Sequence, residues 1–222
     1  IPVPDGDLIE RAAYAIYMEC PVAEYVCVDL AEDGSIMVSS YKEDYEVHLN
    51  PTDNGGVKVV ARINPFYAKT QVQRTFKTED DADADAIRYL VWLAAQKFAA
   101  RGNNSITHIN RRNGVPSTIN RDGKSVPVTS TQRNAIEAIW STFPSVDDLF
   151  IEFAYCSPKS VNISGHRVSC DVLSESLVCT YVNHYGQDWH SVDTSDGSTE
   201  SIEKAFKDAM EIENYIHTGS EN

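Results

Sequence analysis

The chain has 222 residues, of which 42% are hydrophobic and 23% charged, the composition of a folded globular protein and not of a disordered one. It carries 33 acidic and 19 basic side chains, and the net charge of −14 disfavours direct binding of nucleic acid or of anionic membrane surfaces. Because no apolar run reaches the roughly 20 residues that a membrane-spanning helix needs, we expect no membrane segment and a cytoplasmic location.

The first hundred residues predict a helix, a series of strands and a second helix. Residues 8–20 place apolar side chains at helical spacing, and Asp5 or Asp7 precedes them as a candidate N-cap. Short runs rich in Val, Ile and Tyr follow, separated by turn residues, which is typical of antiparallel strands joined by hairpins. These runs cover residues 24–30, 35–41, 45–49, 57–64 and 70–77. An apolar stripe then predicts a helix over about residues 80–100.

The same order returns after residue 133. A helix ending before Pro144 is opened by Thr129 and Gln132, which have the spacing of a capping box. Strand-like runs follow at 149–156, 160–164, 166–172, 177–183 and 188–193, and a helix is expected over 198–216. We summarise the shared order as an α+β fold of two tandem α-β-β-β-β-α units with antiparallel sheets, produced by duplication.

The apolar stripes of the helices support this duplication. One constant offset pairs the stripe of the second helix with that of the last helix: Ile87, Leu90, Val91 and Ala94 with Ile202, Ala205, Phe206 and Ala209. Another offset pairs the first helix with the third: Ile9, Ala12, Ala13 and Ile16 with Ile136, Ile139, Trp140 and Phe143.

Charge divides the chain into three segments. Residues 1–100 hold 9 basic and 17 acidic side chains, residues 101–133 hold 6 and 1, and residues 134–222 hold 4 and 15. We therefore expect two acidic units joined by a basic, hairpin-like connector, with Asn113-Gly114 and Asp122-Gly123 as its turns. Four basic residues of the connector are candidate contact residues: Arg111, Arg112, Arg121 and Lys124.

The connector has several candidate roles. It can lie on an acidic surface of its own chain, join a second copy in a homo-oligomer, contact nucleic acid, or remain a solvated loop. The net negative charge of both flanking units argues against the nucleic-acid role, because phosphate contacts would have to overcome their repulsion.

The densest group of carboxylates stands before the second helix and comprises Glu79, Asp80, Asp81, Asp83 and Asp85. A calcium loop of the EF-hand type counted from Asp81 would need Gly at its sixth position and a carboxylate at its twelfth. Ala86 and Trp92 stand there instead. Acids are favoured at a helix N-terminus by about 0.3–1 kcal/mol each, so the pattern indicates helix initiation, with Thr78 as a candidate cap. The same five acids form the candidate binding surface for a basic partner.

Motifs for nucleotide-driven or standard hydrolase chemistry are absent from the sequence, and no close pair of metal ligands occurs. We therefore expect no cofactor and no metal. The cysteine count of 5, without a C-x-x-C pair, favours free thiols in a reducing compartment. An unrecognised catalytic site would be sought in the C-terminal unit, among His166, Cys170, His184, Asp188 and His190.

The favoured hypothesis is a non-catalytic acidic protein-interaction protein that engages a basic protein partner. One form of it is an inhibitor that blocks a nucleic-acid-binding protein by presenting a DNA-like surface. Two alternatives stay open. One is a processed structural or assembly component of a particle, suggested by the basic connector and by the absence of Met at position 1. The other is an enzyme that uses the C-terminal His and Cys residues.

Overall fold

The computed structural model describes residues 3–42, 44–63, 70–153, 160–174, 176–183, 189–194 and 196–218. The chain divides into two compact units, Ile1–Arg101 (unit 1) and Gly102–Asn222 (unit 2). In each unit a helix is followed by a five-stranded antiparallel meander and a second helix. The expected α+β class with antiparallel sheets is confirmed, with one strand more in each meander than the four of the expected unit.

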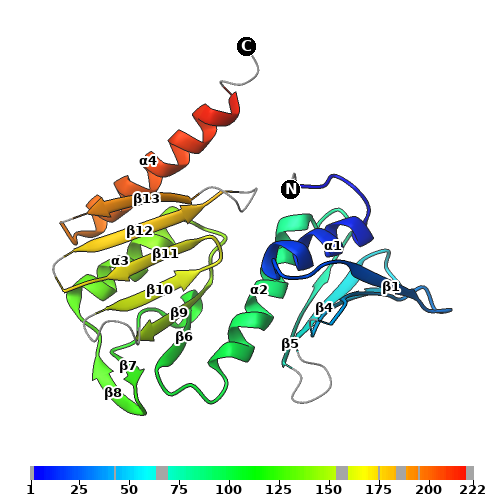
Figure 1. Ribbon diagram of the computed structural model, residues 1–222, viewed down its shortest axis with the longest axis horizontal. Coiled ribbons are helices and arrows are strands. Elements are labelled where there is room, and N and C mark those ends of the chain that lie inside the picture. The colour runs from blue at the N-terminus through cyan, green and yellow to red at the C-terminus, as the bar shows by residue number, and fades with distance from the viewer. Residues whose placement is uncertain are drawn as a thin grey trace. The chain divides into compact units, whose positions relative to one another are not determined.

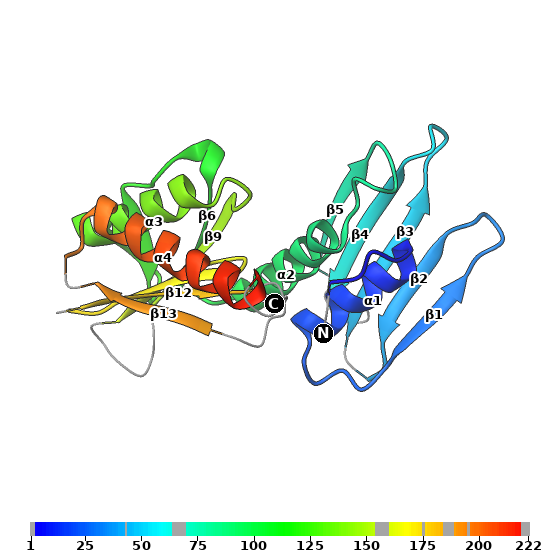
Figure 2. The ribbon, with the colours of Figure 1, turned by 90° about the horizontal axis from the view of Figure 1, so that it is seen from above.

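Unit 1 contains α1 (Leu8–Glu19), β1 (Val26–Leu30), β2 (Ile36–Ser40), β3 (Tyr45–Pro51), β4 (Val57–Ile63), β5 (Thr70–Phe76) and α2 (Ala84–Ala100). The strands are hydrogen-bonded in the order β1-β2-β3-β4-β5, and both helices lie on one face of the sheet (Figure 2). Val38, Val47 and Ala61 face each other on adjacent strands and are fully buried, so this is the core face. Period-2 alternation of apolar residues therefore produced the expected half-buried sheet.

The two helices of unit 1 are joined by a buried ion pair. Arg88 Nε on α2 donates to Glu19 Oε1 on α1 at 2.7 Å, and the two side chains are only 7% and 12% exposed. The expected cap of α1 is Asp7, whose carboxylate accepts from Glu10 N at 3.0 Å.

Unit 2 contains β6 (Ile106–Asn110), the short 3₁₀ helix η1 (Arg111–Asn113), β7 (Thr118–Arg121), β8 (Lys124–Pro127), α3 (Ser130–Thr142), β9 (Asp148–Phe153), β10 (Val161–Gly165), β11 (Val168–Val172), β12 (Leu177–Val182), β13 (Trp189–Thr194) and α4 (Thr199–Thr218). Its six-stranded sheet has the order β13-β12-β11-β10-β9-β6, visible in Figure 1. Helices α3 and α4 pack on one face, where Phe206, Ile139 and Ile163 belong to one core cluster. The capping box of Thr129 and Gln132 is present as expected.

Of the basic segment 101–133, Arg101 is the last residue of unit 1, and residues 102–133 begin unit 2. They include its edge strand β6, the 3₁₀ helix η1, the separate hairpin β7–β8 and the first residues of α3. Asp122 and Gly123 make the hairpin turn with φ values of 50° and 77°, as their sequence predicted. Asn113-Gly114 does not form a hairpin turn and instead ends η1, with Gly114 at a φ of 70°.

The helix before each meander ends in the same way in the two units. Cys20 and Phe143 are the C-caps of α1 and α3, each precedes a proline, and they are 123 residues apart. The expected pairing of Ile16 with Phe143 is therefore wrong by four residues. One helical turn is 3.6 residues, so an apolar stripe identifies the buried face of a helix but not the turn. The expected pairing of α2 with α4 agrees with the structure. Asp83 and Ser198 immediately precede these helices, and they are separated by the same offset as the paired apolar stripes.

No helix in the described ranges is long and apolar enough to cross a membrane.

Candidate protein-interaction surface

Strand β1 is the end strand of the unit 1 sheet and carries uncovered apolar side chains. Among the described strands it pairs with β2 alone. In the described part of unit 1, the exposed large hydrophobic side chains lie on β1 or close to it in sequence or space: Val22 (69% exposed), Tyr25 (45%), Val28 (42%), Leu30 (73%) and Tyr41 (44%). Because scattered single apolar residues are normal but gathered ones are not, this group marks β1 as a candidate interaction surface.

The hydrogen-bond pattern shows which backbone groups of β1 are unused by β2. Tyr41 N donates to Tyr25 O at 3.1 Å and Ala31 N donates to Ser35 O at 2.9 Å, at the two ends of the β1–β2 ladder. Hydrogen-bonded pairs alternate along an antiparallel ladder, so the odd-numbered residues of β1 bond to β2. The N–H and C=O groups of Val26, Val28 and Leu30 are therefore directed away from the sheet.

The side chains of these three residues lie on the core face. Val28 stands directly opposite Val38, which is fully buried, yet Val28 itself is 42% exposed. The helices cover the inner strands, and β1 lies at the end of the sheet (Figure 2). The core face of unit 1 thus continues beyond its helical cover onto β1.

Acidic side chains surround this edge. The segment from Pro21 to Lys42 contains four acids and one base, and the acids are all exposed: Glu24, Asp29, Glu32 and Asp33. The backbone N–H of Ser35, which donates to Asp33 Oδ1 at 2.9 Å, lowers the pKa of that carboxyl. The border of the β1 edge is consequently anionic at neutral pH.

In unit 2 the corresponding edge is occupied. Strand β9, "LFIEF" over residues 149–153, follows β1, "VCVDL", by the same 123 residues that separate the C-caps. Hydrogen bonds from Arg111 N to Asp147 O and from Phe153 N to Ser105 O pair β9 with β6. By the same alternation, Leu149, Ile151 and Phe153 bond to β6. They are the counterparts of Val26, Val28 and Leu30.

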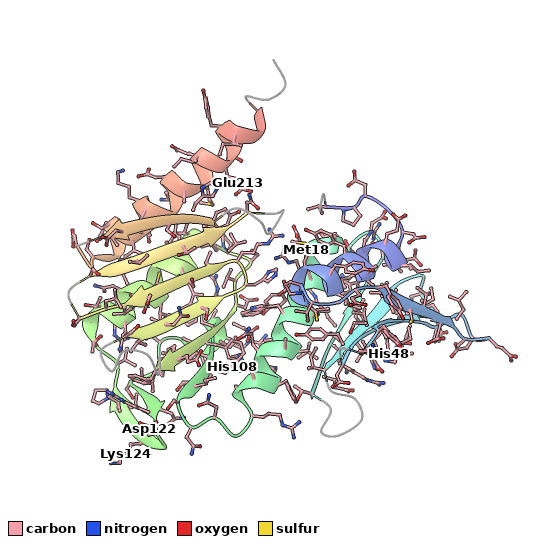
Figure 3. The ribbon with its side chains drawn as sticks, in the orientation of Figure 1. Met18, His48, His108, Asp122, Lys124 and Glu213 are labelled. Atoms are coloured by element: carbon pink, nitrogen blue, oxygen red, sulfur yellow. The ribbon has the colours of Figure 1, made fainter. Side chains whose placement is uncertain are left out.

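The side chains of β6 show how such an edge can be covered. Ile109 lies on the core face and is only 7% exposed. On the other face His108 Nε2 is 2.6 Å from Asp148 Oδ1 of β9, and Asn110 Nδ2 donates to the same oxygen at 3.1 Å. The His108 ring also stacks on Phe150 at 4.7 Å (Figure 3 labels His108). One face of β6 therefore supplies apolar contact and the other supplies hydrogen-bond donors to an acid.

The carboxylates before α2 are distributed along the turn and first residues that open the helix. Asp83 is the N-cap, accepting from Ala86 N at 2.7 Å, so α2 begins at Ala84 and not near residue 80. Thr78 caps the preceding turn by accepting from Asp81 N at 3.2 Å. Glu79, Asp80 and Asp81 are exposed and Asp85 is half-buried.

The backbone of this acidic segment is held by Arg11 of α1. Its Nη1 donates to the carbonyls of Glu79 and Ala82 at 2.8 and 3.2 Å. The contact orders the loop while leaving the carboxylates of Glu79, Asp80 and Asp81 directed to solvent. These acids add to the negative surface of unit 1, but the described contacts do not bring them together around one centre.

We predict that Asp83→Ala lowers the free energy of unfolding of unit 1 by about 1 kcal/mol, since an N-cap acceptor is lost. Asp80→Ala, which removes the same charge from an exposed position, should change it by less than about 0.5 kcal/mol. Urea titration followed by circular dichroism measures both. Equal effects of the two variants would mean that net charge, and not capping, governs this segment.

Of the four basic candidates, two are occupied by contacts within unit 2. Arg111 donates from its guanidinium to the carbonyls of Trp140, Phe143 and Val146, each at 2.7 Å. Arg121 lies over the ring of Phe153, 5.1 Å from its centroid. Arg112 and Lys124 are exposed, with Lys124 at the tip of the β7–β8 hairpin (Figure 3).

The His and Cys candidates are spread over unit 2. Cys170 is fully buried in the core cluster, His166 lies in the turn between β10 and β11, and His190 stands opposite Tyr181 in the sheet. His184 and Asp188 lie outside the described residues. Burial raises the pKa of the Cys170 thiol well above its usual value, which keeps it protonated and a poor nucleophile. Within the described ranges no three His, Cys, Asp or Glu side chains are arranged to hold a metal ion.

The β1 edge was missed by sequence reasoning, which followed charge density. The available signal was the match between "VCVDL" and "LFIEF", two strands with the same order of apolar and acidic residues. Comparisons with protein-family models, curated proteins and solved structures give no match.

Proposed function

We propose that this protein is a non-catalytic interaction protein that binds a basic protein partner, and that β1 receives an extended strand of that partner. The observation that carries the proposal is the open edge of β1, whose counterpart β9 holds a sixth strand. Val26, Val28 and Leu30 offer unused N–H and C=O groups at the positions where β9 bonds to β6. Addition of a strand to an exposed sheet edge is a common mode of peptide recognition.

The surroundings of β1 define the chemistry of the incoming strand. Alternate side chains of an added strand point to opposite faces. One set would lie beside Val28 and Leu30 and should be apolar. The other would lie on the face of Asp29, which is exposed, and should be basic. The exposed acids Glu24 and Glu32 flank β1 in the sequence and add to the negative charge there. The preferred ligand is therefore an antiparallel strand in which apolar and basic residues alternate.

The net charge of −14 supports this choice, because long-range attraction speeds association with a basic partner. It also disfavours a second copy as the occupant, since two β1 edges would bring like charges together. If the bound strand belongs to a nucleic-acid-binding surface, its Lys and Arg side chains become unavailable to phosphate. Inhibition of such a partner would then follow from occupancy, without any catalytic step.

The test uses a fluorescein-labelled peptide of eight residues in which Val alternates with Lys or Arg, and measures its binding by anisotropy. We expect Val28→Pro to weaken binding at least tenfold. The N–H of Val28 points away from β2, so proline removes an edge donor without removing a bond inside the sheet. Hydrogen exchange at Val26, Val28 and Leu30 should slow when the peptide binds.

Two charge variants distinguish the effect of the acids at β1 on binding from the effect of the net charge. Neutralising Glu24 and Asp29 as Gln and Asn should weaken binding and reduce its salt dependence. Neutralising Asp80 and Asp81 as Asn makes the same change in net charge away from β1 and should have little effect. Binding that Val28→Pro leaves unchanged would contradict strand addition at β1, and absence of peptide binding by the wild-type protein would contradict the proposal. A dimer that Val28→Pro dissociates would identify a second copy as the occupant.

A further inference from the structure

Two thiols face each other inside the sheet of unit 2. Cys170 on β11 and Cys179 on β12 are directly opposite in the antiparallel register. Both are free thiols, exposed by 0% and 1%, and both belong to the core cluster under α3 and α4. Their closeness is reflected in the raised pKa of the Cys170 thiol, which comes from burial first and from the neighbouring Cys179 second.

The backbone hydrogen-bond pattern shows whether Cys170 and Cys179 form a hydrogen-bonded or a non-hydrogen-bonded pair of the ladder. Val182 N donates to Arg167 O at 2.8 Å, and Leu173 N donates to Ser176 O at 2.9 Å, at the two ends of the β11–β12 ladder. Hydrogen-bonded pairs therefore involve the odd-numbered residues of β11, and Cys170 belongs to a non-hydrogen-bonded pair.

Geometry at such a position permits a disulfide. Cα atoms of a non-hydrogen-bonded pair are about 4.5 Å apart, with the side chains close together. A disulfide accepts Cα separations of about 4.4–6.8 Å. The bond can consequently form without a change of register or a separation of the two strands.

We infer that Cys170 and Cys179 are an oxidative modification site, where a cross-strand disulfide forms by exchange with a small-molecule disulfide. One protein thiolate attacks the small disulfide and releases one small thiol. The second protein sulfur then attacks the mixed disulfide and releases the other small thiol. The two protons of the cysteines end on the two released thiols, and the protein loses two electrons to the small disulfide, which is reduced.

Burial determines when this reaction occurs. Neither sulfur is accessible in the folded sheet, so a small disulfide reaches the pair during folding or local opening of β11 and β12. Cys27, which is exposed on β1, is the contrasting thiol, because it is accessible without any opening. The pair therefore responds to the redox state during folding or local opening, whereas the surface thiol responds to that of the solution around the folded protein.

The test refolds the full chain from urea in glutathione buffers of increasing oxidised fraction, then quenches with acid and alkylates free thiols. The protein used carries Cys156→Ser, because Cys156 would otherwise share the Cys170 fragment between Glu152 and Glu175. Cleavage after glutamate then separates the two cysteines, because Glu175 lies between them in the sequence. We expect the two fragments to remain joined and to be 2 Da lighter than the sum of the reduced fragments, as the chemistry of losing two hydrogens requires. The joined product should increase with the oxidised fraction.

Two variants serve as controls. Cys27→Ser removes the accessible thiol and should leave the joined fragments unchanged. Cys179→Ser should abolish them and leave Cys170 alkylated. The inference is overturned if both fragments are alkylated in the most oxidising buffer, or if either cysteine is joined elsewhere. Because the fragments come from a protein that keeps both Cys170 and Cys179, this conclusion stands even if Cys179→Ser folds poorly.

Discussion

Arg111→Ala is expected to lower the free energy of unfolding of unit 2 by about 3 kcal/mol, because charge-assisted hydrogen bonds to three carbonyls are lost. The side chain is 33% exposed, so this figure is smaller than the sum of three fully buried bonds. Pro144 has no N–H to donate to Trp140 O at the end of α3, and Arg111 satisfies that carbonyl at 2.7 Å. Asp147 adds an ion pair 3.3 Å from Nε that is not aligned as a hydrogen bond.

The matched control is the next residue along the chain. Arg112→Ala removes the same side chain from an exposed position and should change the free energy of unfolding by less than about 0.5 kcal/mol. Urea titrations in a Trp92→Phe background place the remaining tryptophans, Trp140 and Trp189, in unit 2, so that fluorescence reports this unit. Equal stability of the two arginine variants would contradict the capping role of Arg111.

Phe206→Ala should destabilise unit 2 by about 4 kcal/mol, through lost burial and the cavity left behind. The ring is 1% exposed and meets Phe143 edge-on at 5.1 Å between centroids. Phe143 in turn stacks on Tyr181 of β12 at 5.5 Å, so Phe206 joins α4 to the end of α3 and to the sheet. Thermal unfolding followed by the same fluorescence measures the loss.

Two substitutions bracket this result. Phe206→Leu keeps most of the volume and should cost less than about 1.5 kcal/mol. Lys207→Ala, on the exposed side of the same helix turn, should change stability by less than about 0.5 kcal/mol. A cost for Phe206→Ala no larger than that of Phe206→Leu would show that the core closes around the cavity.

Local chemistry predicted the features that depend on neighbours in sequence. Thr129 and Gln132 form the expected capping box, and Asp122-Gly123 forms the expected hairpin turn. Each needs only a few adjacent residues and one backbone geometry. The capping of the C-terminal end of α3 was not predictable in this way. Arg111 donates to Trp140 O from 29 residues away in the sequence, and its positive charge alone does not indicate this contact.

Sequence by itself determined the order of helices and strands, the antiparallel α+β class and the apolar stripe that each helix buries. Period and turn chemistry are local, and they act before any long-range contact forms. Only the tertiary structure decided that β6 pairs with β9 while β1, among the described strands, pairs with β2 alone, and that Cys170 and Cys179 form a non-hydrogen-bonded pair. Strand neighbours and register depend on pairing between distant segments, for which a single sequence carries no spacing rule.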